Sequence, residues 1–331
     1  MNMLFQTAKT LILMAAIALL PICTLADESG AGYWLVGAAG SLAAAKATPG
    51  CTFASTFYFA DENSTSTVTL PNGQTAKVNV NVKSPFYLPS VSCTPFTKIL
   101  GGQFTASFAW PVVHASVDAT ATLTGTTTGA SKTDSNTGMG DMYPNVNLRW
   151  NRGVNNYLVY VQPGAPFFSY DTSRLANLGA GHMSMDQGFA YTYLNVKTRW
   201  EASFQTGFTY NWENSQTHYQ NGVDMHTDWG TSKFLHYGKS HRIWQIGAVG
   251  YYYQQLTGDS GSGNKVGSNI SRVVSLGPQF GMIHKLNSSW EGYINVKAYG
   301  EFAAQNRSQG YVIFVTWALS HKAQARTAGV E

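Results

Sequence analysis

The sequence has little charge and no long hydrophobic run in its main body. Asp, Glu, Lys and Arg make up 11% of the 331 residues, whereas soluble domains contain about 25%. After the N-terminal region, no stretch approaches the roughly 20 apolar residues that a membrane-spanning helix needs. The formal net charge is only +4, and no basic cluster indicates nucleic-acid binding. The sequence therefore argues against an ordinary soluble domain, a helical membrane protein and a nucleic-acid-binding protein.

The longest apolar run lies at the N-terminus and has the features of an export signal. One cation, Lys9, precedes the run LILMAAIALL at 11–20, and a small-residue cleavage site ends at Ala26. This pattern predicts a secretory signal peptide over residues 1–26, because the run is too short to span a membrane. A lipoprotein signal with Cys23 as the acylated residue is disfavoured, since the residue before it is bulky.

Cysteine is also scarce, with three residues in the chain, of which cleavage after Ala26 would leave Cys51 and Cys93. An even pair in an exported protein predicts one disulfide, and the alternative is two free thiols. Cys51 begins the first expected strand and Cys93 lies near the end of the second. Neighbouring antiparallel strands would bring both residues to the periplasmic rim, within bonding reach.

Aromatic residues, in contrast, are abundant at 13%, and glycine occurs 33 times. Low charge, many Tyr and Trp residues, an export signal and no spanning helix are together typical of a transmembrane β-barrel. Such a barrel is located in the outer membrane of a Gram-negative bacterium. Along each of its strands, lipid-facing apolar residues alternate with lumen-facing polar residues.

Several segments show this alternation. In WEASFQTGFTYNW (200–212), aromatic and apolar residues share one face, interrupted only by Thr206, and polar residues occupy the other. The same period of two appears in 77–83, 145–150 and 290–302. Aromatic residues at both ends of the outer face suit the two interfacial girdles of an outer-membrane barrel. We therefore predict an all-β fold, an antiparallel up-and-down barrel.

Turn signals divide the chain into about twelve strands. Short turns are expected near 99–102, 151–155, 196–199, 236–241 and 286–289, and longer loops near 61–75, 125–137, 172–184, 212–221, 257–269 and 303–310. Short periplasmic turns that alternate with longer external loops are typical of outer-membrane barrels. The barrel is predicted over 51–319, with a C-terminal tail over 320–331. The Gly- and Ala-rich segment 27–50 shows no strand period and is either a lead-in or a plug in the lumen.

Long motifs carry a resemblance to a known family. They are GSLAA with PG (40–50), TGMGDMYPNVNLRWNRGVNNYLVYV (137–161), YDTSRLANLGAGH (170–182), FTYNWENSQTHYQNGVDMHTDWG (208–230), GYYYQQLTGDSGSG (250–263), SRVVSLGPQFG (271–281) and GEFAAQNRSQG (300–310). With them, the chain resembles the outer-membrane protein family named after the meta-cleavage pathway of phenol degradation. The resemblance implies a barrel that transports small hydrophobic compounds. Two features depart from it: Cys51, where an aromatic residue is expected, and the tail after the last expected strand.

The residues expected to face the lumen mix charges with tyrosines. This mixture suits aromatic or amphipathic solutes, because a tyrosine ring stacks while its hydroxyl forms hydrogen bonds. The lumen-facing residues predicted to form the solute path are Arg149, Glu201, Asp224, His226, Asp228, Tyr251, Tyr253, Gln255, Glu291, Tyr293, Lys297, Tyr299 and Glu301. The sequence leaves open the alternative of a closed interior filled with salt bridges.

The run VDMHTDW (223–229) places Asp224, His226 and Asp228 on one face of a strand, about 6.8 Å apart at successive positions. An acid–His–acid set can bind a metal or transfer protons, but a flat strand splays these side chains. We therefore favour a polar lumen wall with a pH-sensitive histidine. We predict no catalytic residue, no metal and no cofactor.

The function predicted from the sequence is a non-enzymatic channel for passive uptake of small hydrophobic or aromatic compounds. Its partners would be that solute, outer-membrane lipid and, during insertion, the barrel-assembly machinery. One alternative is an outer-membrane hydrolase of the phospholipase type, for which Ser215, His182 and His218 lie near expected loops. Another is a structural barrel without transport. The run GDSG around Ser260 resembles a serine-protease motif, but its second glycine and a base-histidine motif are missing, so we interpret it as a turn.

Overall fold

The computed structural model describes residues 32–69, 73–167, 170–236, 242–264, 267–268 and 270–322. The predicted signal peptide over 1–26 and most of the predicted tail over 320–331 lie outside these residues. The last strand continues to Lys322, three residues beyond the end predicted for the barrel.

The described chain folds into β-strands joined by turns and loops. The strands are β1 (Gly50–Thr69), β2 (Thr75–Lys83), β3 (Phe86–Thr94), β4 (Lys98–Ile99), β5 (Gly102–Ala109), β6 (Val112–Leu123), β7 (Gly129–Met139), β8 (Tyr143–Arg152), β9 (Asn155–Gly164), β10 (Ser184–Asn195), β11 (Trp200–Asn211), β12 (Asp224–His236), β13 (Arg242–Gln255), β14 (Arg272–Lys285), β15 (Trp290–Gln305) and β16 (Gln309–Lys322). No helix among the described residues is long and apolar enough to cross a membrane.

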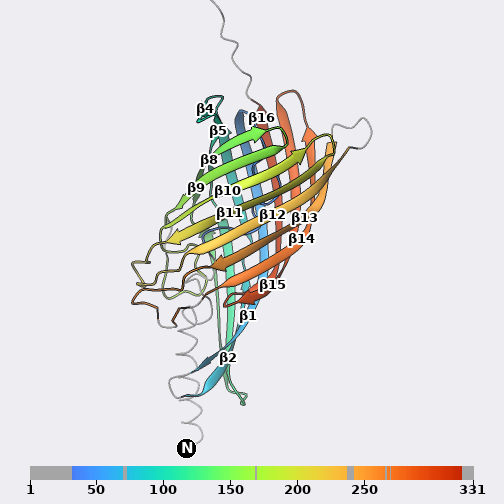
Figure 1. Cartoon of the computed structure of the whole chain (residues 1–331). Helices are drawn as coiled ribbons and strands as arrows, with labels where there is room; N and C mark the ends of the chain where they lie inside the picture. The colour runs from blue at the N-terminus through green and yellow to red at the C-terminus, as the bar shows by residue number, and fades with distance from the viewer. Residues whose placement is uncertain are drawn as a thin grey trace, which may run out of the picture.

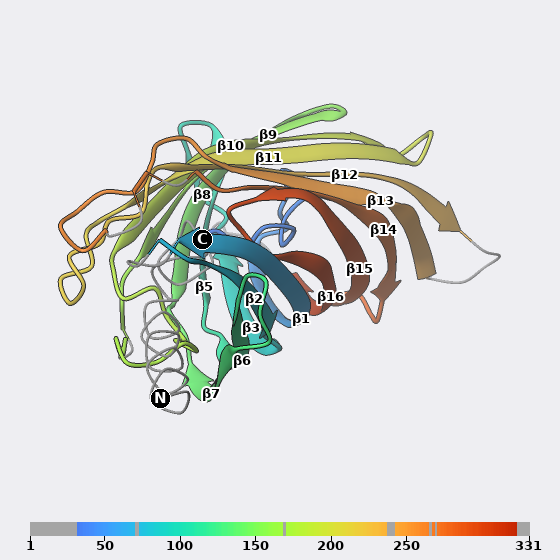
Figure 2. The same ribbon diagram turned by 90° about the horizontal axis from the view of Figure 1, so that it is seen from below.

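The strands close into an antiparallel barrel, as predicted. The last strand, β16, pairs with the first over a long register from Gly50↔Lys322 to Asn63↔Gln309. The ring of pairings runs through β1, β3, β5 and β8 to β16, which is twelve strands, whereas the sheet as a whole contains sixteen strand segments. The segment count exceeds the predicted number of about twelve because three of the long strands are interrupted and because the two-residue strand β4 pairs with β5 outside the ring. Figure 2 shows the strands arranged around the segment that precedes β1.

The interruptions divide β2 from β3, β5 from β6 and β7 from β8. Both β2 and β3 pair with β1, over successive stretches of that strand. In the same way, β5 pairs with β3 and β6 with β2, and β8 pairs with β5 and β7 with β6. Pro85 and Pro111 lie at two of the breaks, where proline cannot donate a hydrogen bond to the ladder. The distal half of β1, together with β2, β6 and β7, forms a sheet extension beyond the barrel, at the bottom of Figure 1.

This extension corrects the prediction of long loops at 61–75 and 125–137. Most of the first range belongs to β1, which continues to Thr69, and most of the second belongs to β7. Their Ser, Asn and Gly residues indicated turns. Both ranges also contain β-branched Thr residues, and each pairs with a neighbouring strand along its length, so ladder hydrogen bonding overrides the turn signal.

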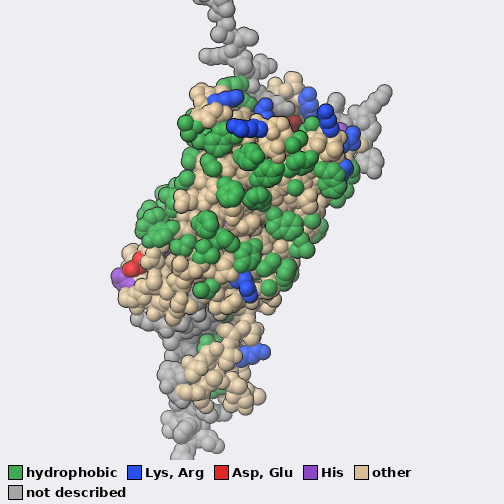
Figure 3. Space-filling model, in the orientation of Figure 1, with side chains coloured by type: hydrophobic (Ala, Val, Ile, Leu, Met, Phe, Trp, Pro, Cys, Tyr) green, Lys and Arg blue, Asp and Glu red, His purple; other side chains and the backbone are tan. Residues whose placement is uncertain are grey.

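The outer wall of the barrel is apolar and the inner wall is polar. On β11, Phe208 is 46% exposed on the outside, whereas its neighbour Thr209 is fully buried inside, and the predicted alternation over 200–212 is confirmed. Hydrophobic side chains cover the middle of the barrel, and Lys and Arg residues gather at its upper end (Figure 3). A closed sheet leaves no unpaired strand edge in the lipid, so this barrel is suited to span the outer membrane.

The predicted disulfide is present at the short-turn end of the barrel. Cys51 on β1 and Cys93 on β3 are directly opposite each other, with their Cα atoms 4.1 Å apart. The two residues precede and follow an excursion of the chain through β2 to the far end of the sheet extension. The bridge therefore fixes the register of the first two long strands where they enter the barrel.

Removing this bridge should lower stability without abolishing the fold. The double variant Cys51→Ser, Cys93→Ser should lose about 2–4 kcal/mol of unfolding free energy, because the bridge closes a loop with a sequence separation of 42 residues. Urea unfolding in lipid vesicles measures this change, and native protein treated with reductant should match the variant. Two reactive thiols in native protein without reductant would contradict the prediction.

Candidate functional site

The segment 32–49, called the plug segment here, lies inside the barrel. At the end with the long loops, Tyr33 stacks on Tyr143 with ring centroids 5.2 Å apart and donates a hydrogen bond to the Pro163 carbonyl at 2.9 Å. Near the short-turn end, the Ala47 carbonyl accepts a hydrogen bond from Gln103 Nε2 at 2.9 Å. The segment therefore runs through the lumen from the end with the long loops to the end with the short turns.

Two buried charges of opposite sign hold the centre of the plug segment. The Asp228 carboxylate on β12 accepts hydrogen bonds from the backbone N–H groups of Gly37 and Ala39, at 3.0 and 3.1 Å. The Lys297 ammonium on β15 donates to the carbonyl groups of Gly37, Ala38 and Ala39, at 2.7–2.9 Å. Charge-assisted hydrogen bonds of this kind are about twice as strong as neutral ones. The turn at 36–39 is thus fixed between an anion and a cation.

A second acid holds the following turn. The Glu201 carboxylate on β11 accepts hydrogen bonds from Ser41 Oγ at 2.9 Å and from the Leu42 backbone N–H at 2.8 Å. The same carboxylate accepts a hydrogen bond from Ser232 on β12 at 2.6 Å. One carboxylate therefore ties the plug segment to two adjacent strands of the wall.

Glycine allows this close contact at two positions. Gly37 has a φ of +82°, and a Cβ atom there would lie 3.0 Å from the Tyr251 ring and 3.1 Å from the Tyr299 ring. Gly230 belongs to the wall, and a Cβ on it would lie 3.0 Å from the Ser41 nitrogen. A side chain at either position would push the plug segment away from the wall.

The acid–His–acid run of β12 is buried inside the barrel, and each side chain has its own partners. His226 Nε2 lies 3.0 Å from Asp186 Oδ2, and its ring stacks on Trp34 of the plug segment with centroids 4.1 Å apart. Asp224 accepts a hydrogen bond from the Tyr253 hydroxyl at 2.7 Å. Among the described residues, no group of three or more His, Cys, Asp or Glu side chains is arranged to hold a metal ion.

A cavity of about 350 Å³ lies on the other side of the plug segment. Strands β3, β5, β8 and β9 form its wall, and Trp34 and Leu35 of the plug segment face it. It is lined from Tyr143 to Arg149 on β8, a distance of about 20 Å at 3.4 Å per residue. The cavity therefore runs lengthwise through the lumen, along most of one strand.

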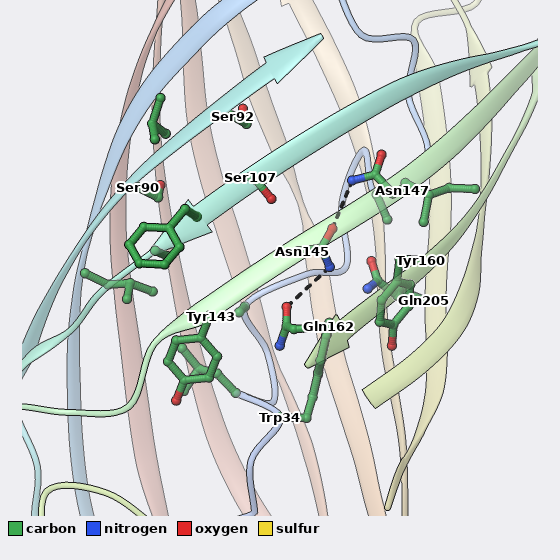
Figure 4. Close-up of a pocket in the computed structure, with 18 of the residues that line it drawn as sticks. Trp34, Ser90, Ser92, Ser107, Tyr143, Asn145, Asn147, Tyr160, Gln162 and Gln205 are labelled. Atoms are coloured by element: carbon green, nitrogen blue, oxygen red, sulfur yellow. Dashed lines mark hydrogen bonds between the residues drawn. The ribbon is translucent and has the colours of Figure 1, made fainter. Parts of the chain in front are cut away.

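Neutral polar groups and aromatic rings both line this cavity (Figure 4). Asn147 Nδ2 donates to Asn145 Oδ1 at 3.0 Å, and Asn145 Nδ2 donates to Gln162 Oε1 at 3.3 Å. The rings of Trp34, Tyr143 and Tyr160 lie beside these amides. Pockets with apolar walls and a few placed polar groups are typical of small-molecule sites.

Comparison with known proteins identifies the family. The family model described as "Putative MetA-pathway of phenol degradation" matches residues 58–317. The chain belongs to this family. The expected resemblance to the phenol-degradation family is therefore confirmed, and the match extends over nearly the whole barrel. No curated protein matches the chain.

Solved structures place this phenol-degradation family member among outer-membrane barrels. The COG4313 outer membrane channel from Pseudomonas putida F1 has a TM-score of 0.59 and 11% identity, over 83% of this chain and 96% of that chain. A Pseudomonas aeruginosa FadL homologue has a TM-score of 0.40 and 8% identity, over 86% of this chain and 92% of its own. The first of these shares the fold. The family member is an outer-membrane β-barrel.

In this family member, most of the predicted lumen-facing residues pack against the plug segment or against one another. Nine of them are buried: Glu201, Asp224, His226, Asp228, Tyr251, Tyr253, Gln255, Lys297 and Tyr299. Tyr251 donates a hydrogen bond to Glu301 at 2.6 Å, and Tyr293 donates to Gln245 at 2.7 Å. Glu291 lies near the short-turn end of β15. That a solute passes along these residues stays a prediction.

Of the predicted residues, Arg149 lines the cavity. Asn145 and Asn147 line it as well and were not predicted, although both belong to the alternating run 145–150 and share the face of Arg149. Tyr160 and Gln162, which occupy alternate positions of β9, were not predicted either. Reading every second residue of each predicted strand would have found all four. The plug residues gave no comparable signal.

The residues considered for a hydrolase lie in the loops at the external end. His218 Nδ1 is 2.9 Å from Glu213 Oε1, and His182 Nδ1 is 3.3 Å from Ser184 Oγ. Ser184 is 2% exposed and donates its own hydrogen bond to Asn211. Ser260 pairs through its backbone with Gln220 of the preceding long loop.

A buried carboxyl at the external rim should make stability depend on pH. Asp141 lies between β7 and β8, accepts a hydrogen bond from the Ala180 backbone N–H at 2.7 Å, and has its pKa raised from 3.8 to about 6 by burial. The folded state therefore binds this proton more tightly than the unfolded chain. The resulting stabilisation is complete below pH 3.8 and is lost as the pH rises through about 6.

Raising the pH from 4.5 to 7.5 should therefore cost the native protein about 2 kcal/mol more unfolding free energy than it costs an Asp141→Asn variant. Urea unfolding of the two proteins in vesicles, at both pH values, measures the difference. An equal pH dependence in the two proteins would show that Asp141 does not titrate in this range.

Proposed function

We propose that this outer-membrane barrel is a channel for the passive uptake of small hydrophobic or aromatic compounds. The lengthwise cavity between the plug segment and the β3–β5–β8–β9 wall carries the proposal. Its volume of about 350 Å³ is within the usual range for small-molecule pockets. Diffusion down a gradient needs no cofactor and no catalytic group, so the wall alone would provide the selectivity.

The chemistry of the wall supports an aromatic or amphipathic solute. The Tyr143 and Tyr160 rings, together with Leu158, offer apolar surface, and the Asn145 and Gln162 amides offer hydrogen-bond donors and acceptors. An aromatic ring stacks favourably on such side chains, whereas a sugar of equal size would leave most of its hydroxyl groups unpaired. Tyr251, Tyr253 and Tyr299 hold the plug segment on the opposite side, and they would meet solute where the plug segment moves away.

Solute entry into liposomes that contain the refolded protein tests this proposal. The panel contains alkylphenols, longer hydrophobic compounds and sugars of similar size, and faster entry of the aromatic compounds alone is the expected result. Ser107→Trp, which places a bulky ring in the cavity, should slow entry, and Val146→Trp, on the lipid face of the adjacent strand, should not. Equal entry of sugars would indicate a general pore, and no acceleration of any solute would contradict a channel.

A further inference from the structure

The cavity contains a cation that has no anion beside it. The Arg149 guanidinium donates from Nη1 to Thr105 Oγ1 at 2.9 Å, and its Nε atom is buried without a hydrogen-bond partner. Within the described part of the chain, no Asp or Glu oxygen lies within 4.0 Å of it. This contrasts with Lys297, which is surrounded by three carbonyl groups and lies on the same wall as Asp228.

The other residues that line the cavity do not compensate this charge. Arg149 is the single charged side chain among them, and the rest are apolar, aromatic, hydroxyl or amide groups. Leu158, its direct partner across the β8–β9 pair, is buried and apolar. The guanidinium therefore has an apolar surface on one side and open volume on another.

An unpaired charge in such a place is costly unless a ligand neutralises it. Guanidinium binds carboxylate with two parallel hydrogen bonds, and its planar shape and fixed donors favour that group. The volume beside Arg149 is bordered by Leu158 and Tyr160, which suits a single apolar ring. A neutral hydrocarbon would fill the volume and leave the cation without a partner, and a cationic solute would be repelled.

We propose that this cavity binds aromatic monocarboxylates, such as benzoate, and that Arg149 selects them over neutral aromatic compounds. The inference rests on the proposed uptake function and narrows its substrate class. One cation matches one negative charge, so dianions and polyanions would be compensated only in part. The apolar wall disfavours small inorganic anions, which have no ring to place against Leu158 and Tyr160.

The test compares benzoate with benzyl alcohol, which has a similar shape and no charge. Equilibrium binding of each radiolabelled compound to the detergent-solubilised full chain is measured first, and their entry into proteoliposomes second. The native protein should bind benzoate more tightly than benzyl alcohol. Arg149→Gln should weaken benzoate binding about tenfold or more and leave benzyl alcohol unchanged, because it removes charge-assisted hydrogen bonds. Arg149→Lys should retain part of the preference.

Arg152→Gln is the matched control. Arg152 lies three residues further along β8, is exposed at the short turn, and does not line the cavity. It should leave both measurements unchanged, and a heat-dependent shift on gels shows that each variant is folded. Equal binding of the two compounds by the native protein, or an unchanged preference in Arg149→Gln, would overturn the inference. Benzyl alcohol entering vesicles in that case would leave the uptake function standing, whereas entry of neither compound would contradict both.

Discussion

A Lys297→Met variant should conduct ions several-fold better than the native protein. Lys297 is the cation that binds three successive carbonyl groups of the plug segment, and methionine fills a similar volume without donating a hydrogen bond. The substitution also leaves the buried Asp228 without the cation that binds the same turn, and the loss of three charge-assisted hydrogen bonds should lower the stability. Single-channel recording in planar bilayers measures the conductance, and urea unfolding in vesicles measures the stability.

Two further variants show whether the effect arises in the lumen. Lys77→Met removes an exposed lysine from the sheet extension and should change neither measurement. Asp228→Asn combined with Lys297→Met should lower stability by less than the sum of the two single changes, because the two charges hold the same turn from opposite sides. Native conductance in Lys297→Met would mean that the remaining contacts, such as those of Glu201, are enough to keep the plug segment in place.

Gly37→Val should displace the plug segment through its backbone instead of its charges. Gly37 has a φ of +82°, a conformation that costs a β-branched residue at least about 1–2 kcal/mol. The new Cβ would also meet the rings of Tyr251 and Tyr299 at 3.0 and 3.1 Å. We expect increased conductance together with a loss of stability, measured in the same bilayers and vesicles.

Gly125→Val separates backbone strain from crowding. Gly125 has a similar φ of +77°, but no atom lies within 4 Å of the position that its Cβ would take. This variant should lose only the strain energy and keep the native conductance. If both glycine variants conduct alike, crowding against the tyrosines does not position the plug segment.

The barrel wall is predictable from the sequence because alternation is local. Along β11, Phe208 and Tyr210 point outward while Glu201 and Ser203 are buried, and the pattern can be seen within a few consecutive residues. In a membrane barrel the two faces meet different surroundings, lipid and lumen. Each strand therefore has to alternate, and its sequence shows it.

The plug segment is not predictable in this way, because its partners are distant in sequence. Gly37 bonds to Asp228 and to Lys297, at separations of 191 and 260 residues. The segment has no period of its own, and small residues that fit closely against a wall look like a flexible linker in the sequence. The segment makes many of its contacts through backbone N–H and C=O groups, which its residue types do not reveal. Only the three-dimensional placement of buried charges reveals the contacts.

The site was predicted only in part for a related reason. Most of the predicted lumen-facing residues lie on β11–β15, because charged residues and tyrosines are most frequent at alternate positions there. The same residue types also suit a wall that binds another segment of the chain, and in this structure the wall binds the plug segment. The cavity lies against β3, β5, β8 and β9, where amides and serines such as Asn145 and Ser107 are less conspicuous in the sequence.

The seam between β1 and β16 has a consequence for how the protein folds. It joins Gly50 to Lys322 and Asn63 to Gln309, the longest sequence separations in the barrel. Contacts between residues so far apart in the sequence form slowly, because most of the chain's conformational freedom has to be lost before they are made. The seam also cannot form until the last strand has been synthesised, and the plug segment that precedes β1 must already lie inside when it does. A chain truncated before β16 would therefore have two open sheet edges and no enclosed lumen in which to hold that segment.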